Sequence, residues 1–300
     1  MSATQTLTVP RSQGASNNFQ PQRRRGRPDW YLLGLWISLF IAAAAWSIPF
    51  LIMVFTSVKT NADAGSIAPW LPPTEWAWEN YATAVDVGNL WVTASNSLLI
   101  AVIKVPLGLL LAAAAAFALS RIRFRGRKAL LAIFVVGSMV PVQIALGPLF
   151  NTMLTLDLLD SVGGLILPYL AFGIPYQIFI LHGFFSAIPG ELEEAARIDG
   201  ASTFRIFWQI CLPLALPALA ALFILDFVAT WNEYAIAQTL LQSQSNWTIP
   251  LAVQGFSTQF ATDYGALNAF IIMSVVPVLI VYLLFQRYFV AGALAGGVKS

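Results

Sequence analysis

The sequence predicts an all-α integral membrane protein with about six transmembrane helices, because it is apolar throughout and almost free of charge. Of its 300 residues, 58% are hydrophobic and only 10% are charged. A water-soluble domain carries about 25% charged residues, since its surface must be hydrated. A chain with so few charges cannot cover itself in that way, so we expect much of its exterior to face lipid.

Six apolar stretches are long enough to cross a bilayer, which takes roughly 20 helical residues. They cover residues 30–55, 90–119, 129–150, 162–183, 213–230 and 266–285. The first is longer than the core of a signal peptide, so we predict that it is retained as a spanning helix. The fifth begins at Pro213, a residue that suits the first turn of a helix.

Four prolines interrupt the third and fourth stretches, and they are Pro141, Pro148, Pro168 and Pro175. Proline removes a backbone donor and frees the carbonyl one turn earlier. Neighbouring helices can satisfy such carbonyls inside a membrane protein. We therefore predict kinked helices in these two stretches.

The positive charges predict the orientation of the spans. Arginine and lysine cluster before the first stretch, over residues 121–128, between the fourth and fifth stretches, and after the sixth. With an even number of spans these segments share one side, which the positive-inside rule identifies as the cytoplasm. We predict a disordered basic cytoplasmic leader over residues 1–29, a transmembrane domain over residues 30–290 and a cytoplasmic tail over residues 291–300. Nothing in the basic segments predicts a folded face for nucleic acid.

Catalytic and metal sites of several kinds are excluded by what the sequence lacks. A single cysteine, Cys211, and a single histidine, His182, exclude a disulfide framework and a cysteine or histidine metal cluster. The sequence has no Gly-x-x-x-x-Gly-Lys-[Ser/Thr] phosphate loop, no His-Glu-x-x-His and no Gly-x-Ser-x-Gly. We therefore expect a chain that is not an enzyme and that binds no cofactor or metal directly.

The segment between the fourth and fifth stretches, residues 184–212, predicts two short helices around a sharp turn. The first turn of the first helix carries three glutamates, where the helix dipole favours anions; they are Glu191, Glu193 and Glu194. Gly200 can adopt a positive φ and end this helix. Ser202 can then cap the second helix.

One face of the first short helix favours the docking of a partner. Leu192, Ala195 and Ala196 share this face at helical spacing. A helix that anchors in the membrane surface carries larger apolar residues. Docking is therefore the preferred interpretation, and an amphipathic loop on the membrane surface is the alternative.

The same segment resembles the EAA motif of the transmembrane subunits of binding-protein-dependent ABC importers. The resemblance rests on Glu194-Ala195-Ala196, Asp199-Gly200-Ala201 and Leu212-Pro213. In that family the motif forms the coupling helix, which inserts into a cleft of a separate ATPase subunit. The resemblance therefore implies the type I ABC importer permease fold and assigns the coupling role to these eight residues.

The resemblance continues outside the motif and is similar to the carbohydrate branch, in particular its MalG-type subunits. It rests on Asn80-Tyr81, Asn96-Ser97-Leu98, Trp231-Asn232-Glu233-Tyr234 and the C-terminal segment 286–299. It implies a prokaryotic cytoplasmic (inner) membrane, a second related permease, two ATPase subunits that use ATP and Mg²⁺, and an external solute-binding protein. The expected function is import of a sugar or oligosaccharide. A permease for glycerol phosphate, an amino acid or a peptide is the alternative.

Charged residues within the apolar stretches predict where the translocation path lies. At 1.5 Å per residue, Lys104 is roughly 25 Å from the cytoplasmic end of its helix, at a depth between Asp226 and Glu233. An isolated charge is costly in a bilayer, so we predict that Lys104 pairs with one of these carboxylates beside the path. The predicted path also includes Trp231 and Asn232. The alternatives are that Lys104 extends to the outer interface or that it contacts an anionic substrate.

A secondary transporter driven by an ion gradient is the alternative class of protein. That class has internal repeats, discontinuous helices and carboxylates near the middle of the membrane. Asp226 is a carboxylate of this kind. Six helices in one chain are few for that class, which makes the importer subunit the preferred interpretation.

Overall fold

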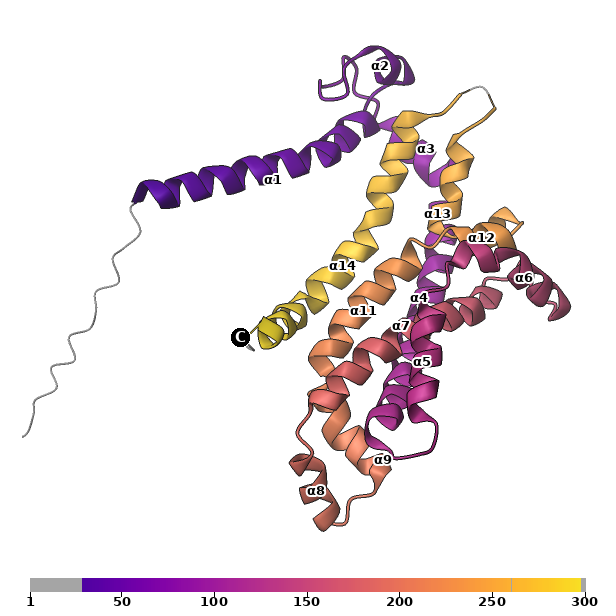
Figure 1. Ribbon diagram of the computed structural model, residues 1–300. Coiled ribbons are helices and arrows are strands. Elements are labelled where there is room, and N and C mark those ends of the chain that lie inside the picture. Colours follow the sequence, from indigo (N-terminus) through magenta and orange to yellow (C-terminus); the bar gives the residue numbers. More distant parts are fainter. Residues whose placement is uncertain (1–28, 260, 298–300) are drawn as a thin grey trace, which may run out of the picture. The chain divides into compact units, whose positions relative to one another are not determined.

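The computed structural model describes residues 29–259 and 261–297, with side chains for residues 30–259 and 261–286. Within these ranges the chain is helical, and the one strand-like pairing is an isolated bridge between Ser257 and Thr262. The chain forms two compact units, residues 1–48 and 49–300. The described part of the first unit belongs to helix α1 (Asp29–Ser57), which ends in the second unit (Figure 1). The predicted leader lies outside the described residues, apart from Asp29.

The described residues contain four helices long and apolar enough to span a membrane, and up to six spans if two bent helix pairs each count as one. The four are α1, α4 (Leu90–Arg121), α7 (Ile166–Ala187) with the 3-10 turn before it (Gly163–Leu165), and α14 (Tyr264–Gly297). The bent pairs are α5 (Arg127–Ser138) with α6 (Val142–Thr155), and residues 203–214 with α11 (Leu216–Trp231). The predicted fold class of about six helical spans is thereby confirmed.

The third stretch is more strongly broken than the predicted kink. Helices α5 and α6 meet at 98°, and Pro141 lies in the break at the N-terminal boundary of α6. Helix α6 continues through Pro148 and α7 through Pro175, and Pro168 lies in the first turn of α7. A break is therefore confirmed at Pro141, and kinks at the other three prolines stay a prediction.

The fifth and sixth stretches also differ from their predicted bounds. A run made of α9 (Thr203–Ile206), a π-helical turn (Phe207–Cys211) and α10 (Leu212–Leu214) leads to a bend of 72° at Ala215. The fifth span thus begins at Leu216, not at Pro213. Helix α14 continues to Gly297, so the predicted boundary between residues 290 and 291 does not end a helix.

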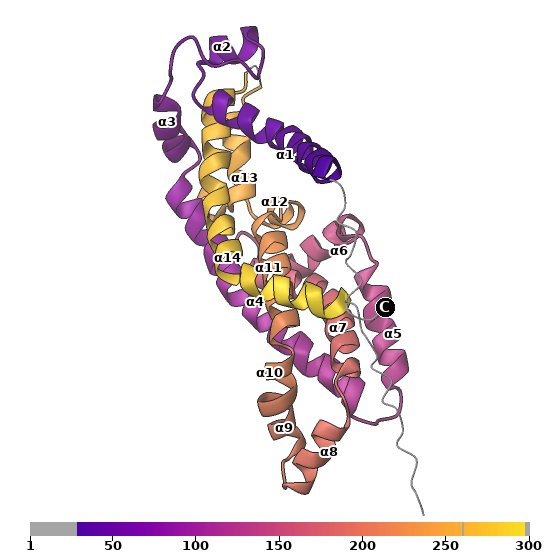
Figure 2. The same cartoon turned by 90° about the vertical axis from the view of Figure 1, so that its left-hand side faces the viewer.

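The two ends of the larger unit carry different small helices. One end carries α8 (Glu191–Ile198) and α9 (Figure 2). The opposite side of the bundle carries the other short helices, which are α2 (Asn61–Ser66), α3 (Glu79–Val87), α12 (Ala235–Leu240) and α13 (Ile249–Ala252). The α8 end lies next to the arginine-rich loop 121–128, and the positive-inside rule predicts that this end faces the cytoplasm.

The core lies where α4 packs against α7 and α11. Small residues let these helices approach closely, as is usual between membrane helices; buried examples on α4 are Ala101, Ala112, Ala113 and Ala116. Aromatic rings fill the end of the core near α8. The ring centroid of Phe117 lies 6.1 Å from that of Phe185 and 5.1 Å from that of Phe207. This packing gives α8 and α9 a fixed base.

Candidate functional site

The segment predicted to couple to a partner folds as two short helices around a turn. Helix α8 ends at Ile198, and Gly200 has φ of +79°. This left-handed conformation favours glycine, so a side chain here would strain the turn. The Oγ atom of Ser202 accepts a hydrogen bond from the N–H of Arg205 at 3.3 Å and caps α9. The predicted turn and cap are both confirmed.

The tip of this segment exposes apolar side chains. Leu192 and Ile198 on α8 are 45% and 87% exposed, and Phe204 on α9 is 73% exposed. Ala195 is exposed, whereas Ala196 is half-buried against the core. The predicted face of Leu192, Ala195 and Ala196 is therefore split between the surface and the base. The exposed part is an apolar surface of the kind that a partner covers.

The other residues of the motif take different positions. Glu194, Asp199 and Gly200 are exposed with Ala195 at the tip. Ala201 and Leu212 are half-buried against the core, and Leu212 and Pro213 begin the separate short helix α10. The eight motif residues thus form an exposed tip and a packed base.

An ion pair that the sequence did not predict fixes α8 to the rest of the bundle. The Nε atom of Arg121, the last residue of α4, lies 3.0 Å from Oε1 of Glu193. The Nη2 atom of Arg121 also donates to the carbonyls of Phe185 and Ile188, at 2.5 Å each. Glu193 is buried, unlike its neighbours on α8. Arg121 therefore ties α8 to the ends of α4 and α7, and we name these groups the Arg121 brace.

Lys104 pairs with Asp226, as predicted, while the position of this pair beside a translocation path stays a prediction. Its Nζ atom lies 2.5 Å from Oδ1 of Asp226 and 3.2 Å from the hydroxyl of Thr230. Lys104 is 3% exposed, so it does not extend to the interface. Gly173 on α7 makes room for the pair, because a Cβ there would lie 2.9 Å from Nζ. A buried pair of opposite charges avoids the cost of either charge alone.

Glu233 lies near this pair but has other partners. Its Oε2 atom accepts a hydrogen bond from the hydroxyl of Tyr169 at 2.6 Å and from the N–H of Ala237 at 3.1 Å. Its Oε1 atom accepts from the N–H of Ile236 at 2.8 Å, so the carboxylate caps the start of α12. A carboxylate at a helix N-terminus is stabilised by backbone donors and the dipole.

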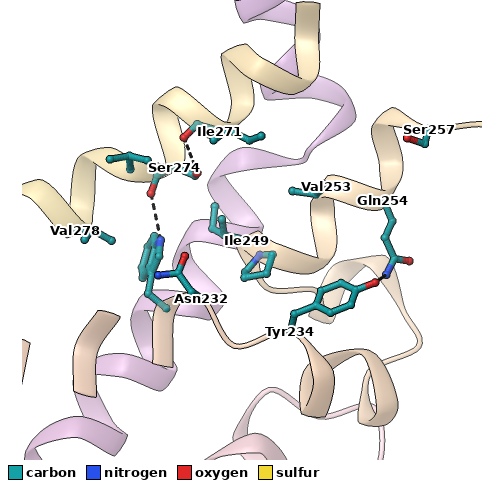
Figure 3. Close-up of a pocket in the computed structure, with 12 residues that line it drawn as sticks. Asn232, Tyr234, Ile249, Val253, Gln254, Ser257, Ile271, Ser274 and Val278 are labelled. Carbon is teal, nitrogen blue, oxygen red and sulfur yellow. Dashed lines mark hydrogen bonds between the residues drawn. The ribbon is translucent and has the colours of Figure 1, made fainter. Parts of the chain in front are cut away.

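The predicted path residues divide between two hollows. Lys104, Asp226 and Glu233 line one cavity of about 230 Å³ together with Tyr169. Trp231 and Asn232 instead line a groove of about 710 Å³ between the end of α11, α13 and α14 (Figure 3). The five residues therefore do not form one site. That these five residues lie along a translocation path stays a prediction.

The larger groove has polar groups on an apolar wall and no charged side chain. Tyr234 and Gln254 face each other in Figure 3, where Nε2 of Gln254 donates to the Tyr234 hydroxyl at 2.6 Å. Asn232 is exposed, and its amide donates to the carbonyl of Val228 at 2.9 Å. Trp231 is buried, and its indole N–H donates to the carbonyl of Ser274 on α14 at 3.1 Å. The groove thus offers a tyrosine face, a free amide oxygen and aliphatic side chains.

Hydrogen bonds hold the loop that leads to this groove. Asp160 accepts from the N–H groups of Gln242 and Ser243 at 2.9 Å each, and from the hydroxyl of Ser243. These donors hold the pKa of the Asp160 carboxyl well below its usual range. From the other side, the Asn96 amide donates to the carbonyls of Ser245 and Trp247 at 2.9 and 3.0 Å. The loop over residues 241–247 is therefore fixed to both α4 and the connection before α7.

Comparison with known proteins connects this architecture to a family. A family model described as "Binding-protein-dependent transport system inner membrane component" matches residues 104–293, more than half of the chain. A putative ABC transporter permease protein of Caldicellulosiruptor sp. is 37% identical over 271 residues, which are 90% of this chain and 97% of that protein. The diacetylchitobiose uptake system permease protein NgcG of Streptomyces coelicolor is 37% identical over 268 residues, 89% of this chain and 86% of that protein.

A solved structure shares the fold as well as part of the sequence. It is a chain of a bacterial ABC transporter involved in the import of the acidic polysaccharide alginate, with 26% identity and a TM-score of 0.72. The match covers 88% of this chain and 98% of the solved one. On these grounds the chain belongs to the family of inner membrane components of binding-protein-dependent transport systems.

Proposed function

We propose that this chain is one transmembrane subunit of an ATP-driven importer in a prokaryotic inner membrane. It carries no catalytic site of its own and takes its energy from a separate ATPase subunit that docks on the exposed tip of α8. The observation that carries the proposal is the form of the coupling segment. Its motif residues Glu194, Ala195 and Gly200 are exposed, on a base held by the Arg121 brace. A rigid base is what allows a push at the tip to move the spans.

The Arg121 brace connects a movement of α8 to the spanning helices α4 and α7. Glu193 lies on the coupling helix, while Arg121 ends α4 and Phe185 lies near the end of α7. Helices α4 and α7 also hold Lys104 and Gly173, which lie in contact beside Asp226. A movement of α8 therefore reaches two of the helices that line the cavity around Lys104 and Asp226.

A saccharide is the proposed substrate. Two of the similar proteins are named for diacetylchitobiose uptake and alginate import. The 710 Å³ groove offers Tyr234, Asn232 and Gln254 beside an apolar wall, which suits a molecule with many hydroxyls and apolar ring faces. Lys104 is neutralised by Asp226, which gives no support to an anionic substrate such as glycerol phosphate. The same pair also neutralises the carboxylate that favoured a secondary transporter.

The proposed assembly contains a second, related permease, two ATPase subunits and a solute-binding protein. The groove of Trp231 and Asn232 is open on one side, and a path for a polar solute through lipid must be closed. A second permease supplies the missing wall. The solute-binding protein approaches the end that carries α12 and α13, opposite the coupling tip.

Purification from native membranes tests the proposal. We expect a tagged chain to bring with it a second permease and an ATPase subunit, and the complex to hydrolyse ATP. Gly200→Pro and Glu194→Lys should release the ATPase, because the first breaks the turn and the second reverses a charge at the tip. Glu79→Lys is the matched control, since it reverses the charge of an exposed glutamate on α3, at the end of the bundle opposite α8. A chain that purifies alone and drives uptake by an ion gradient would overturn the proposal.

A further inference from the structure

A cleft at the cytoplasmic face collects positive charge beside the coupling helix. It has a volume of about 820 Å³ and lies between the connection from α4 to α5 and helix α8. Its charged lining consists of Arg121, Arg123, Arg127, Arg197, Glu193 and Glu194. The arginines thus outnumber the glutamates by two.

Most of this positive charge has no partner. Arg121 is neutralised by Glu193 in the Arg121 brace. Arg123, Arg127 and Arg197 form no ion pair with any other described residue. One carboxylate, Glu194, remains against these three. The cleft therefore presents two net positive charges that the described chain leaves unneutralised.

The cleft lies at the level where the spans leave the membrane. Helix α4 ends at Arg121, α5 begins at Arg127 and α7 ends at Ala187. Between the arginines of the loop stand Ile122 and Phe124, which are 40% and 42% exposed. Alternating cations and apolar or aromatic side chains are typical of a segment in the headgroup region.

Helix α5 adds to the attraction for an anion and supplies an apolar surface. Its N-terminal boundary at Gly126 has no side-chain cap, and its first turn carries two cations but no acid. Cations at a helix N-terminus are repelled by the positive end of the helix dipole. An anion bound beside both reduces this repulsion. None of its residues is buried, and Ile133 and Val136 are 65% and 64% exposed. Acyl chains can therefore lie along α5 from the cleft into the bilayer.

We propose that this cleft binds the phosphate headgroup of an anionic phospholipid of the inner leaflet. Arg123, Arg127 and Arg197 hold the phosphate, and the acyl chains follow the outer face of α5. Basic pockets between membrane helices on the cytoplasmic side bind anionic headgroups in this way. Because α8 forms one wall, an occupied cleft steadies the base of the coupling helix.

Lipid retention tests the proposal on the full chain, together with any subunits that purify with it. Native mass spectrometry compares binding of dioleoyl phosphatidylglycerol with that of dioleoyl phosphatidylcholine. We expect the double variant Arg123→Gln with Arg127→Gln to bind phosphatidylglycerol roughly 30-fold more weakly, since each of the two basic groups near a surface contributes about 1 kcal/mol. The matched control is Arg125→Gln with Arg205→Gln, which removes two charges from the same end of the bundle but not from the cleft or the first turn of α5.

Two further comparisons keep the test decisive. The variant Arg123→Lys with Arg127→Lys keeps the charge and should regain most of the binding, which shows that the chain is folded. The proposal fails if the cleft and control variants lose binding equally, or if the wild-type chain does not distinguish the two lipids. It also fails if millimolar inorganic phosphate displaces the lipid signal, which indicates a soluble anion, or if the cleft variants release the ATPase but keep phosphatidylglycerol. The outcome is independent of the proposed transport function.

Discussion

At the scale of single residues, the ion pair of Lys104 and Asp226 is the interaction on which the middle of the bundle most depends. Both side chains are at most 10% exposed. Removing one partner of a buried pair leaves an uncompensated charge, which costs about 3–5 kcal/mol. Replacing both partners with apolar residues is far less costly. Removal of one partner is therefore expected to cost more stability than the intact pair contributes relative to two apolar residues.

We expect Lys104→Met and Asp226→Leu to destabilise the purified chain strongly as single variants, and the double variant to recover most of the loss. Thermal unfolding in detergent measures all three. The recovery follows because the double variant leaves no unpaired charge in the bundle. A double variant that is no more stable than the less stable of the two single variants would show that the two side chains do not act as a pair.

Gly173 offers a finer test of the same packing. A Cβ at Gly173 would lie 2.9 Å from Nζ of Lys104, whereas a Cβ at Gly183, on the same helix, meets nothing within 4 Å. Gly→Ala in a helix otherwise stabilises by about 1 kcal/mol. We expect Gly183→Ala to raise the melting temperature and Gly173→Ala to lower it. If both variants raise the melting temperature equally, the absence of a side chain at Gly173 is not required for the packing of Lys104.

Asp160 predicts a pH dependence outside the membrane. Its folded pKa lies below the ordinary value, so the contribution of its hydrogen bonds is fully present above that ordinary value. The contribution is lost only as the pH falls through the folded pKa. Hydrogen exchange of residues 241–247 should therefore stay constant between pH 8 and 5 after correction for the intrinsic rate. Asp160→Asn should speed this exchange at neutral pH, and a wild-type transition near pH 6 would contradict the assignment.

At the scale of elements, the coupling segment combines a free tip with a fixed base. Glu193 is buried beside Arg121, while Glu191 on the same helix is exposed. We expect Glu193→Gln to loosen α8 and to reduce the stimulation of the partner ATPase several-fold. The reason is that the variant removes the carboxylate that pairs with Arg121. Glu191→Gln is the matched control and should change little.

Hydrogen exchange of residues 191–198 gives the structural readout for this comparison. Faster exchange in Glu193→Gln alone supports the Arg121 brace as the connection from α8 to α4 and α7. Equal exchange in both variants, with equal ATPase stimulation, would show that α8 is held by packing and not by the ion pair.

The apolar spans and the two short helices between the fourth and fifth spans could be predicted from the sequence, but the short helices of the other loops could not, and neither could every break. Each proline in a span carries the same local penalty. Pro141 follows Gly137 and Ser138, which are weak helix formers, and there the helix breaks. Gly147 directly precedes Pro148 and Gly173 lies two residues before Pro175, yet α6 and α7 continue through these prolines. The sequence shows where prolines weaken a helix, and the packing of neighbouring helices determines at which proline the helix ends.

The candidate site was predicted in part for a similar reason. The turn at Gly200 follows from local chemistry and was found. The separation of Trp231 from Asp226 depends on how α11 is rotated. Helical spacing contained this signal, since Asp226, Thr230 and Glu233 share one face and Trp231 lies on another. The contact of Tyr169 with Glu233 joins residues 64 positions apart, and no pattern within one helix reveals it.

At the scale of the whole molecule, the larger unit carries the segment proposed to couple to the ATPase and the groove proposed for the substrate at different ends. Helices α8 and α13 lie toward opposite ends (Figure 1), and the groove of Trp231 and Asn232 is lined by residues of α13. Helix α11 runs between them and carries Asp226 on its face toward α4. The open groove and the exposed tip are two surfaces that a single chain leaves uncovered. Both are explained by a subunit of a larger transporter.

Thiol cross-linking in native membranes tests the central claim most directly, which is that the α8 tip docks an ATPase subunit. A cysteine is placed at exposed Ala195, with exposed Ala82 on α3 as the control position; the native Cys211 is buried. We predict a cross-linked product with an ATPase subunit from position 195 and none from position 82, with a yield that changes when ATP is added. No ATPase product from position 195, in membranes where the chain still supports uptake, would contradict the account.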